Sequence, residues 1–163
     1  MALRNLMDRW WVGWAAAVAM VVGSYAWLWL QPDPVEPPRY RQYRPEAVCL
    51  LTGEAGVLDS QVAPIWAGMQ EASLRLRVRV SHVAISGPQT VDNGATFVAG
   101  MAQGRCDLLL AAGEVATRSV ALMAPRFPEQ RFAVVGGSKS DNVTVVEGTA
   151  SAARDLMLEG FSS

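Results

Sequence analysis

Three apolar stretches of strand length each end in glycine and lead into a new segment, and this recurrence most constrains how the chain can fold. Residues 47–51 run into Gly53, residues 108–112 run into Gly113, and residues 132–135 run into Gly136 and Gly137. Short apolar runs without polar alternation are typical of strands that are buried on both faces of a parallel sheet. The recurrence therefore predicts repeated strand–helix units.

The rest of the chain extends this alternation. Strand patterns cover residues 47–52, 77–85, 107–112, 131–136 and 143–147, and helical patterns cover residues 61–75, 91–103, 114–124 and 150–160. Such alternation favours an α/β fold, because parallel strands need crossover connections that place helices on the sheet. We expect a single lobe with a five-stranded parallel sheet of order 2-1-3-4-5 and helices on both faces.

The segment before this lobe has a different character. Residues 10–30 carry no charge, and tryptophans lie near both ends of the run. A helix of this length rises by about 30 Å, which matches the hydrocarbon core of a bilayer. The run predicts one transmembrane helix after a short cytoplasmic tail of residues 1–9. A cleaved signal peptide is the alternative, but the run does not end in the small residues of a cleavage site.

A proline-rich stretch links this helix to the lobe. Five prolines fall within residues 31–45, which favours an extended, semi-rigid stalk. Arginines flank the apolar run on both sides, so the positive-inside rule gives no clear orientation. Because that rule weakens when a long domain follows, we expect the amino terminus inside. The chain is then a single-pass protein of the cell membrane, with residues 46–163 on the extracytoplasmic face.

Charge and composition limit the partners of the lobe. The formal net charge is -1 and the sequence pI is about 5.8, and 18% of the residues are charged. No cluster of basic residues interleaved with aromatic residues is found, so the sequence carries no positive field for a phosphate backbone. We therefore expect no nucleic-acid partner.

The two cysteines leave two possibilities open. Cys49 and Cys106 lie near the starts of two strands that are neighbours in the expected sheet order. Outside the cytoplasm they could form a disulfide, although parallel neighbours in register seldom satisfy disulfide geometry. The alternative is a pair of buried thiols.

Catalytic and metal-binding motifs are not found in the sequence. His82 is the only histidine and has no metal-ligand partner at a suitable spacing. The chain has no G-x-S-x-G, P-loop or G-x-G-x-x-G motif, and its loop carboxylates form no recognisable acid–base pair. We expect a protein that is not an enzyme and that uses no cofactor or metal.

The loops that follow the strands form the candidate ligand site. In open parallel sheets, ligands bind beyond the carboxyl ends of the strands, where glycine allows close approach and helices direct N–H groups outward. The loops at residues 53–60, 113–114 and 136–140 should lie at one edge of the sheet. The alternative is that these glycines serve only tight turns. The predicted ligand-binding residues are Gly53, Glu54, Asp59, Ser60, Gly113, Glu114, Gly136, Gly137 and Ser138.

Four short motifs carry a resemblance to a known family. They are TGEAGVLDS over residues 52–60, WAGMQEA over residues 66–72, GRCD over residues 104–107 and RFPEQRFAVVGG over residues 126–137. With these motifs, the stretch from residue 48 to residue 137 resembles the first lobe of the basic membrane protein (BMP) family. Members of this family are solute-binding proteins of ABC transporters, and known members bind purine nucleosides.

The chain departs from that family at the positions that hold the nucleoside. Family members usually carry aspartate where Gly53 and Gly136 stand, and a Phe-Asn pair where Gln61 and Val62 stand. The resemblance therefore implies a solute-binding-protein-like module whose nucleoside contacts are not retained. It also implies an ABC permease, or a partner that supplies a second lobe. The alternative function is an interaction or sensory domain at the cell surface that has lost solute binding.

Overall fold

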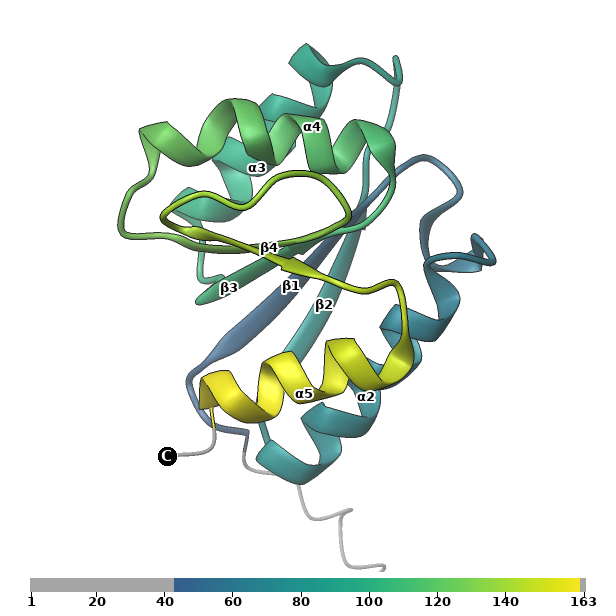
Figure 1. Ribbon diagram of the computed structural model, residues 1–163, viewed down its shortest axis with the longest axis vertical. Helices are drawn as coiled ribbons and strands as arrows, with labels where there is room; N and C mark the ends of the chain where they lie inside the picture. The colour runs from purple at the N-terminus through teal and green to yellow at the C-terminus, as the bar shows by residue number, and fades with distance from the viewer. Residues whose placement is uncertain (1–42, 162–163) are drawn as a thin grey trace, which may run out of the picture. The chain divides into compact units, whose positions relative to one another are not determined.

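The computed structural model of the chain describes residues 43–161. Strands alternate with helices along this part of the chain, except between the last two strands (Figure 1). The elements are β1 (Ala47–Thr52), the 3-10 helix η1 (Gly56–Leu58), α2 (Ala63–Leu76), β2 (Arg79–Ala84), α3 (Val91–Gln103), β3 (Leu108–Ala111), α4 (Glu114–Met123), the 3-10 helix η2 (Ala124–Arg126), β4 (Arg131–Val135), β5 (Val143–Val146) and α5 (Ala150–Phe161).

The five strands form one parallel sheet of order β2-β1-β3-β4-β5. This order confirms the predicted topology. Helical crossovers join the first four strands, but β4 and β5 are joined without a helix. The segment of residues 136–142 instead returns along the sheet, because the Phe132 N–H near the start of β4 donates to the Asn142 carbonyl.

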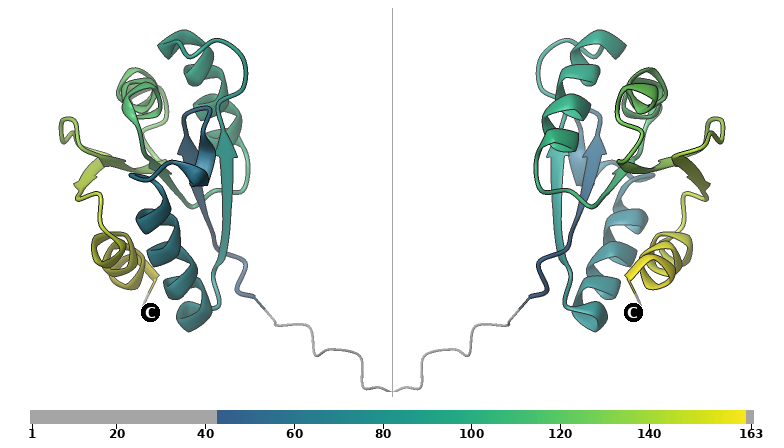
Figure 2. Two further views of the ribbon diagram at one scale, coloured as in Figure 1. Left: turned by 90° about the vertical axis from the view of Figure 1, so that its right-hand side faces the viewer. Right: turned by 90° about the vertical axis from the view of Figure 1, so that its left-hand side faces the viewer.

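Helices cover both faces of the sheet. Figure 1 and Figure 2 show α3 and α4 on one face and α2 and α5 on the other. Successive side chains of β1 enter opposite cores: Val48 and Leu50 pack with α2 and α5, and Leu51 packs with α3 and α4. Because both faces are covered, β1 and β3 are apolar along almost their whole length.

The predicted boundaries are wrong around the second strand. The sequence predicts a helix to residue 75 and a strand over residues 77–85, but α2 continues to Leu76 and β2 covers only Arg79–Ala84. Arg77 between them has φ 58° and ends the helix in the left-handed conformation. A cap of this kind usually falls on glycine, so the sequence carries no sign of it.

A disulfide joins Cys49 in β1 to Cys106 in the loop before β3. The Cα atoms of the two cysteines are 5.7 Å apart, within the usual range for a disulfide. Cys49 pairs in register with Leu109, so Cys106 does not lie opposite Cys49 in the ladder. The objection to in-register cysteines therefore does not apply, and of the two possibilities the structure contains the disulfide.

The predicted cytoplasmic tail, transmembrane helix and most of the stalk lie outside the described residues. Within residues 43–161, no helix is both long enough and apolar enough to cross a bilayer.

Candidate functional site

Three strand ends meet at one edge of the sheet. An ideal Cβ atom built on Gly113, which follows β3, would lie 3.9 Å from the backbone nitrogen of Gly53, which follows β1. Gly137 follows β4, and a Cβ atom there would lie 3.0 Å from the Thr117 Cγ2 atom of α4. The loops after β1, β3 and β4 are thus close together, as the glycine pattern predicts.

Three of the four glycines that were predicted to bind a ligand have backbone conformations that favour glycine. The φ angles are 95° at Gly113, 74° at Gly136 and 92° at Gly137. Tight turns therefore explain these three glycines without any ligand. Gly53 does not have a positive φ, and a Cβ atom added to it would meet Gln89 Oε1 at 3.7 Å.

A cavity of about 350 Å³ opens at this edge, between the first turns of α2 and α4. Buried Ile65, Val62 and Ala112 give it an apolar floor. The residues that line it are Asp59, Gln61, Val62, Ile65, Ala112, Gly113, Glu114, Thr117, Arg118, Val135 and Gly137. The volume is at the low end of the range for small-molecule sites.

Two carboxylates and one guanidinium group stand at the rim. The Glu114 Oε1 and Arg118 Nη1 atoms are 3.3 Å apart in α4, and both side chains are exposed. The Asp59 Oδ1 atom accepts a hydrogen bond of 2.8 Å from the Gln61 N–H in the turn before α2. Each carboxylate lies at the positive end of a helix, where negative charge is favourable.

Helix α4 also offers backbone donors to the cavity. Gly113 precedes this helix, and no side chain accepts a hydrogen bond as its cap. The Thr117 N–H bonds to the Gly113 carbonyl at 3.0 Å, whereas the first N–H groups of a helix have no partner within it. The site can therefore donate hydrogen bonds from backbone and Arg118 and accept them through carboxylates and the Thr117 hydroxyl.

Four of the nine predicted residues line the cavity: Asp59, Gly113, Glu114 and Gly137. Five do not: Gly53, Glu54, Ser60, Gly136 and Ser138. The Glu54 N–H is instead held by Gln89 Oε1 at 3.3 Å, and Gln89 Nε2 donates to the Ile85 carbonyl. Gln89, which the sequence did not single out, thus ties the loop after β2 to the loop after β1.

The expected position of residues 136–140 is only partly correct. Ser140 pairs with Val143, and Val143 is aligned with Phe132, the second residue of β4. Ser140 therefore lies near the opposite edge of the sheet, where β5 begins. The sequence did not predict this position of Ser140, because the whole segment reads as a loop that follows β4.

Several cavity residues escaped prediction. Thr117 and Arg118 follow the predicted Glu114 by three and four residues, so helical spacing alone could have indicated them. Gln61 and Val62 line the cavity, and they stand at positions where members of the BMP family, which the sequence resembles, hold their ligand. Val135 and Ile65 could not be predicted as cavity residues from the sequence. Both are apolar, and apolar residues are needed at a strand end and in a helix turn for packing whether or not a ligand binds.

The described residues hold no group of three or more His, Cys, Asp or Glu side chains placed to bind a metal ion. His82 lies on the edge strand β2, and its ring packs edge to face against Trp66 with centroids 5.3 Å apart.

No protein-family profile matches the chain, and no curated protein matches it in sequence. Several solved structures are similar to the chain, among them the following two. A fragment of a provisionally assigned lipoprotein from Peptoclostridium difficile 630 aligns with a TM-score of 0.60 and 14% identity, over 72% of this chain and 99% of that one. An ABC transporter system solute-binding protein from Aeropyrum pernix K1 aligns with a TM-score of 0.52 and 25% identity, over 63% of this chain.

The chain spans only 28% of the length of that solute-binding protein. The similarity therefore concerns one part of a larger architecture, and the relation to the BMP family in particular stays a prediction. At the level of the fold, the described lobe is similar to a part of an ABC-transporter solute-binding protein.

Proposed function

We propose that this chain is a membrane-tethered, extracytoplasmic solute-binding module that holds a small molecule in the cavity between α2 and α4. The observation that carries the proposal is the position of this cavity, at the carboxyl ends of β1, β3 and β4. Ligands of open parallel sheets bind at that edge. The similarity to an ABC-transporter solute-binding protein supports the same role.

The disulfide supports a location outside the cytoplasm. Disulfides persist in oxidising compartments and are rare in the cytosol of most organisms. The bond between Cys49 and Cys106 is consistent with the orientation expected from the sequence, in which residues 46–163 lie on the extracytoplasmic face.

The solute is held differently from the nucleosides of the BMP family. No aromatic side chain is among the described residues that line the cavity, and Gln61 and Val62 stand where members of that family usually carry a Phe-Asn pair. We propose a small solute that places an apolar part over Val62 and Ile65. Its polar groups face the carboxylates, Arg118 and the backbone donors of α4.

One lobe alone encloses such a solute on one side only, whereas typical sites bury 70–90% or more of a ligand. We propose that an ABC permease, or a separate protein that supplies a second lobe, covers the open side. We propose that the module delivers its solute unchanged, as a solute-binding protein does.

A thermal-shift screen of the chain tests the proposal. Nucleosides, amino acids and other small metabolites are added singly, and a binding solute at 100 times its Kd stabilises the lobe by about 2.7 kcal/mol. The shift should be lost or reduced in Glu114→Gln and Thr117→Val. It should be kept in Glu147→Gln, which removes the same charge from an exposed residue after β5.

Equal shifts in all three variants and the parent chain would place the binding site elsewhere. No shift with any solute would favour the interaction or sensory domain instead.

A further inference from the structure

A second cavity, of about 550 Å³, lies at the opposite edge of the sheet, where β1 and β2 begin. Arg79 and Arg105 line it together with the hydroxyl-bearing side chains of Tyr43 and Ser81, and the disulfide forms part of its wall. We call it the arginine groove. It faces away from the proposed solute cavity, because parallel strands separate the two edges.

The charge of the arginine groove is positive. None of its described lining residues is acidic. The nearby carboxylate of Asp107 accepts a hydrogen bond of 2.7 Å from the Ala47 N–H, and Glu46 pairs with Arg44 at 3.4 Å. Two guanidinium groups thus face the groove, and the carboxylates of Asp107 and Glu46 are not among its described lining residues.

Within residues 43–161, both arginines keep donors free for a ligand. Arg79 donates one hydrogen bond of 2.9 Å, from Nη2 to the Pro45 carbonyl, and a guanidinium group has five N–H donors. Arg105 is exposed, and within residues 43–161 its side chain makes no hydrogen bond or ion pair. Guanidinium groups match the geometry of phosphate oxygens and bind them through paired hydrogen bonds.

The chain enters the lobe at this groove. Tyr43 lines it and is the first residue that the structure describes. By the expected topology, 12 residues separate Tyr43 from the membrane helix, which ends at residue 30. The arginine groove is therefore at the edge of the lobe that the chain reaches first after the expected membrane helix, whereas the solute cavity lies at the far edge of the sheet.

We propose that the arginine groove binds the phosphate groups of anionic lipids, and so sets the lobe on the membrane with its solute cavity directed away from the bilayer. The proposal rests on the membrane tether of the proposed function. Each basic side chain near an anionic bilayer strengthens the binding constant for the surface by about fivefold. This attraction falls off within a Debye length.

Hydroxyl-radical footprinting of the full chain tests this proposal. The chain is reconstituted in nanodiscs of phosphatidylcholine alone, or of phosphatidylcholine with phosphatidylglycerol. Tyr43 in the groove should react several-fold more slowly in the anionic discs, and salt at about 1 M should remove this protection. Leu58, which is 91% exposed beside the solute cavity, should react equally in both kinds of disc.

Two matched variants sharpen the result. Arg105→Gln should reduce the protection of Tyr43 by about fivefold. Arg118→Gln removes one positive charge from α4 at the other edge of the sheet, and in discs without added solute it should leave the protection unchanged. Circular dichroism of both variants should match the parent chain, because neither side chain is buried.

Each remaining outcome contradicts the proposal in a distinct way. Equal Tyr43 reactivity in both discs would overturn lipid binding and leave the solute-binding proposal intact. Equal protection by free inorganic phosphate in neutral discs would make the groove a site for soluble anions. Failure of the chain to enter either disc would overturn the tether, and with it both the membrane part of the proposed function and this proposal.

Discussion

The carboxamide of Asn142 connects three separate parts of the backbone near the start of β5. Its Nδ2 atom lies 3.1 Å from the Ala124 carbonyl, 2.9 Å from the Phe127 carbonyl and 3.2 Å from the Gln130 carbonyl. These carbonyls belong to the segment around η2, in which the Ala124 carbonyl also accepts from the Phe127 N–H and the Phe127 carbonyl from the Gln130 N–H. Asn142 therefore holds the connection between α4 and β4 against the edge strand.

Replacing Asn142 with alanine should destabilise the lobe. The variant removes the hydrogen bonds of the carboxamide, while the Ala124 and Phe127 carbonyls keep their backbone donors, so the expected cost is about 0.5–1.5 kcal/mol of unfolding free energy. Urea unfolding followed by circular dichroism measures the change. Thr144→Val, which alters a neighbouring exposed side chain of β5, serves as the control and should unfold at the parent midpoint. An Asn142→Ala variant of unchanged stability would show that these hydrogen bonds do not hold the edge.

Gly113 shows where prediction from single residues succeeds and where it ends. The glycine after an apolar run predicted a turn at the end of β3, and its φ of 95° requires such a residue. The contact of Gly113 with the loop of Gly53 followed from the rule for parallel sheets. The part played by Arg118 and Ile65 in the same cavity depends on how α2 and α4 rotate about their axes, which no local pattern of sequence determines.

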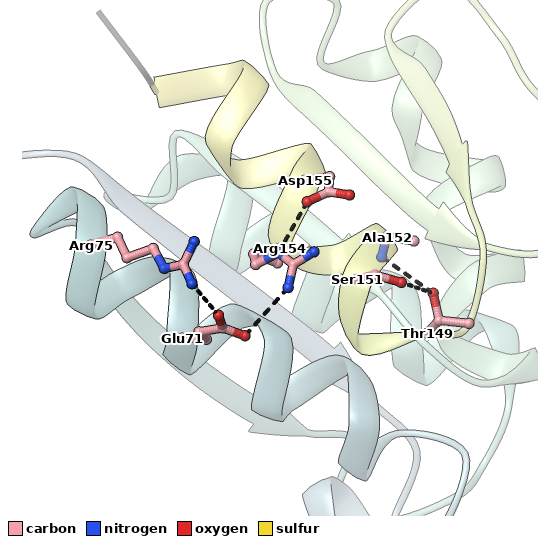
Figure 3. A network of polar contacts seen from close by, with 7 residues as sticks. All are labelled: Glu71, Arg75, Thr149, Ser151, Ala152, Arg154 and Asp155. Atoms are coloured by element: carbon pink, nitrogen blue, oxygen red, sulfur yellow. Dashed lines mark hydrogen bonds and ion pairs between the residues drawn. The ribbon is translucent and has the colours of Figure 1, made fainter.

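At the scale of elements, α2 and α5 pack most closely at Gly68. An added Cβ atom at Gly68 would collide with the backbone carbonyl of Ala150, the first residue of α5. Only a residue without a side chain allows the two helices to approach this closely. Figure 3 shows a polar contact that bridges the same pair of helices, between Glu71 of α2 and Arg154 of α5. Glu71 also contacts Arg75 of its own helix.

The polar bridge contributes less than the glycine contact. Arg154 lies 3.6 Å from Glu71 and 3.0 Å from Asp155, and the hydrogen bond to Asp155 raises the pKa of the Arg154 guanidinium above its ordinary value. Arginine is charged at every relevant pH, so this shift adds no pH dependence. Exposed ion pairs usually contribute between zero and about 1 kcal/mol.

Two glycine-to-alanine variants separate close packing from helix propensity. Gly68→Ala should destabilise the lobe by at least about 2 kcal/mol, because backbone of α5 must move. Gly100→Ala in α3 should stabilise it by about 0.5–1 kcal/mol, because nothing lies within 4 Å of the added atom and alanine favours helix. Chemical denaturation measures both. A Gly68→Ala variant as stable as Gly100→Ala would contradict the packing of α2 on α5.

The sheet order was predictable because β1, β3 and β4 are apolar and each is followed by glycine. The limits of prediction lie at the edges of the sheet. β2 carries exposed polar residues on an edge strand, so its start at Arg79 was missed. The return of residues 136–142 along the sheet was missed because a parallel connection without a helix is unusual, and parallel strands normally need a longer crossover.

At the scale of the whole molecule, the disulfide fixes the edge where the chain enters. It joins residues 57 positions apart and ties β1 to the loop between α3 and β3. Closing a loop of this length lowers the entropy of the unfolded chain and is worth about 4 kcal/mol in the loop-entropy account.

Reduction should therefore lower the unfolding free energy by about 4 kcal/mol. The double variant Cys49→Ser and Cys106→Ser should have the same lowered stability and should not respond to a reductant. Urea unfolding of the parent chain with and without dithiothreitol makes the comparison. Identical midpoints for the oxidised and reduced parent chain would show that the bond does not stabilise the lobe.

The central claim is that a small solute binds in the cavity between α2 and α4. The most direct test is to record amide resonances of the ¹⁵N-labelled chain while a solute from the thermal-shift screen is added. We predict that Gly113, Glu114, Thr117 and Gly137 shift first and in proportion to occupancy, while Arg105 at the opposite edge does not shift. Shifts confined to the arginine groove or to the helix faces, or no shift with any solute, would contradict it.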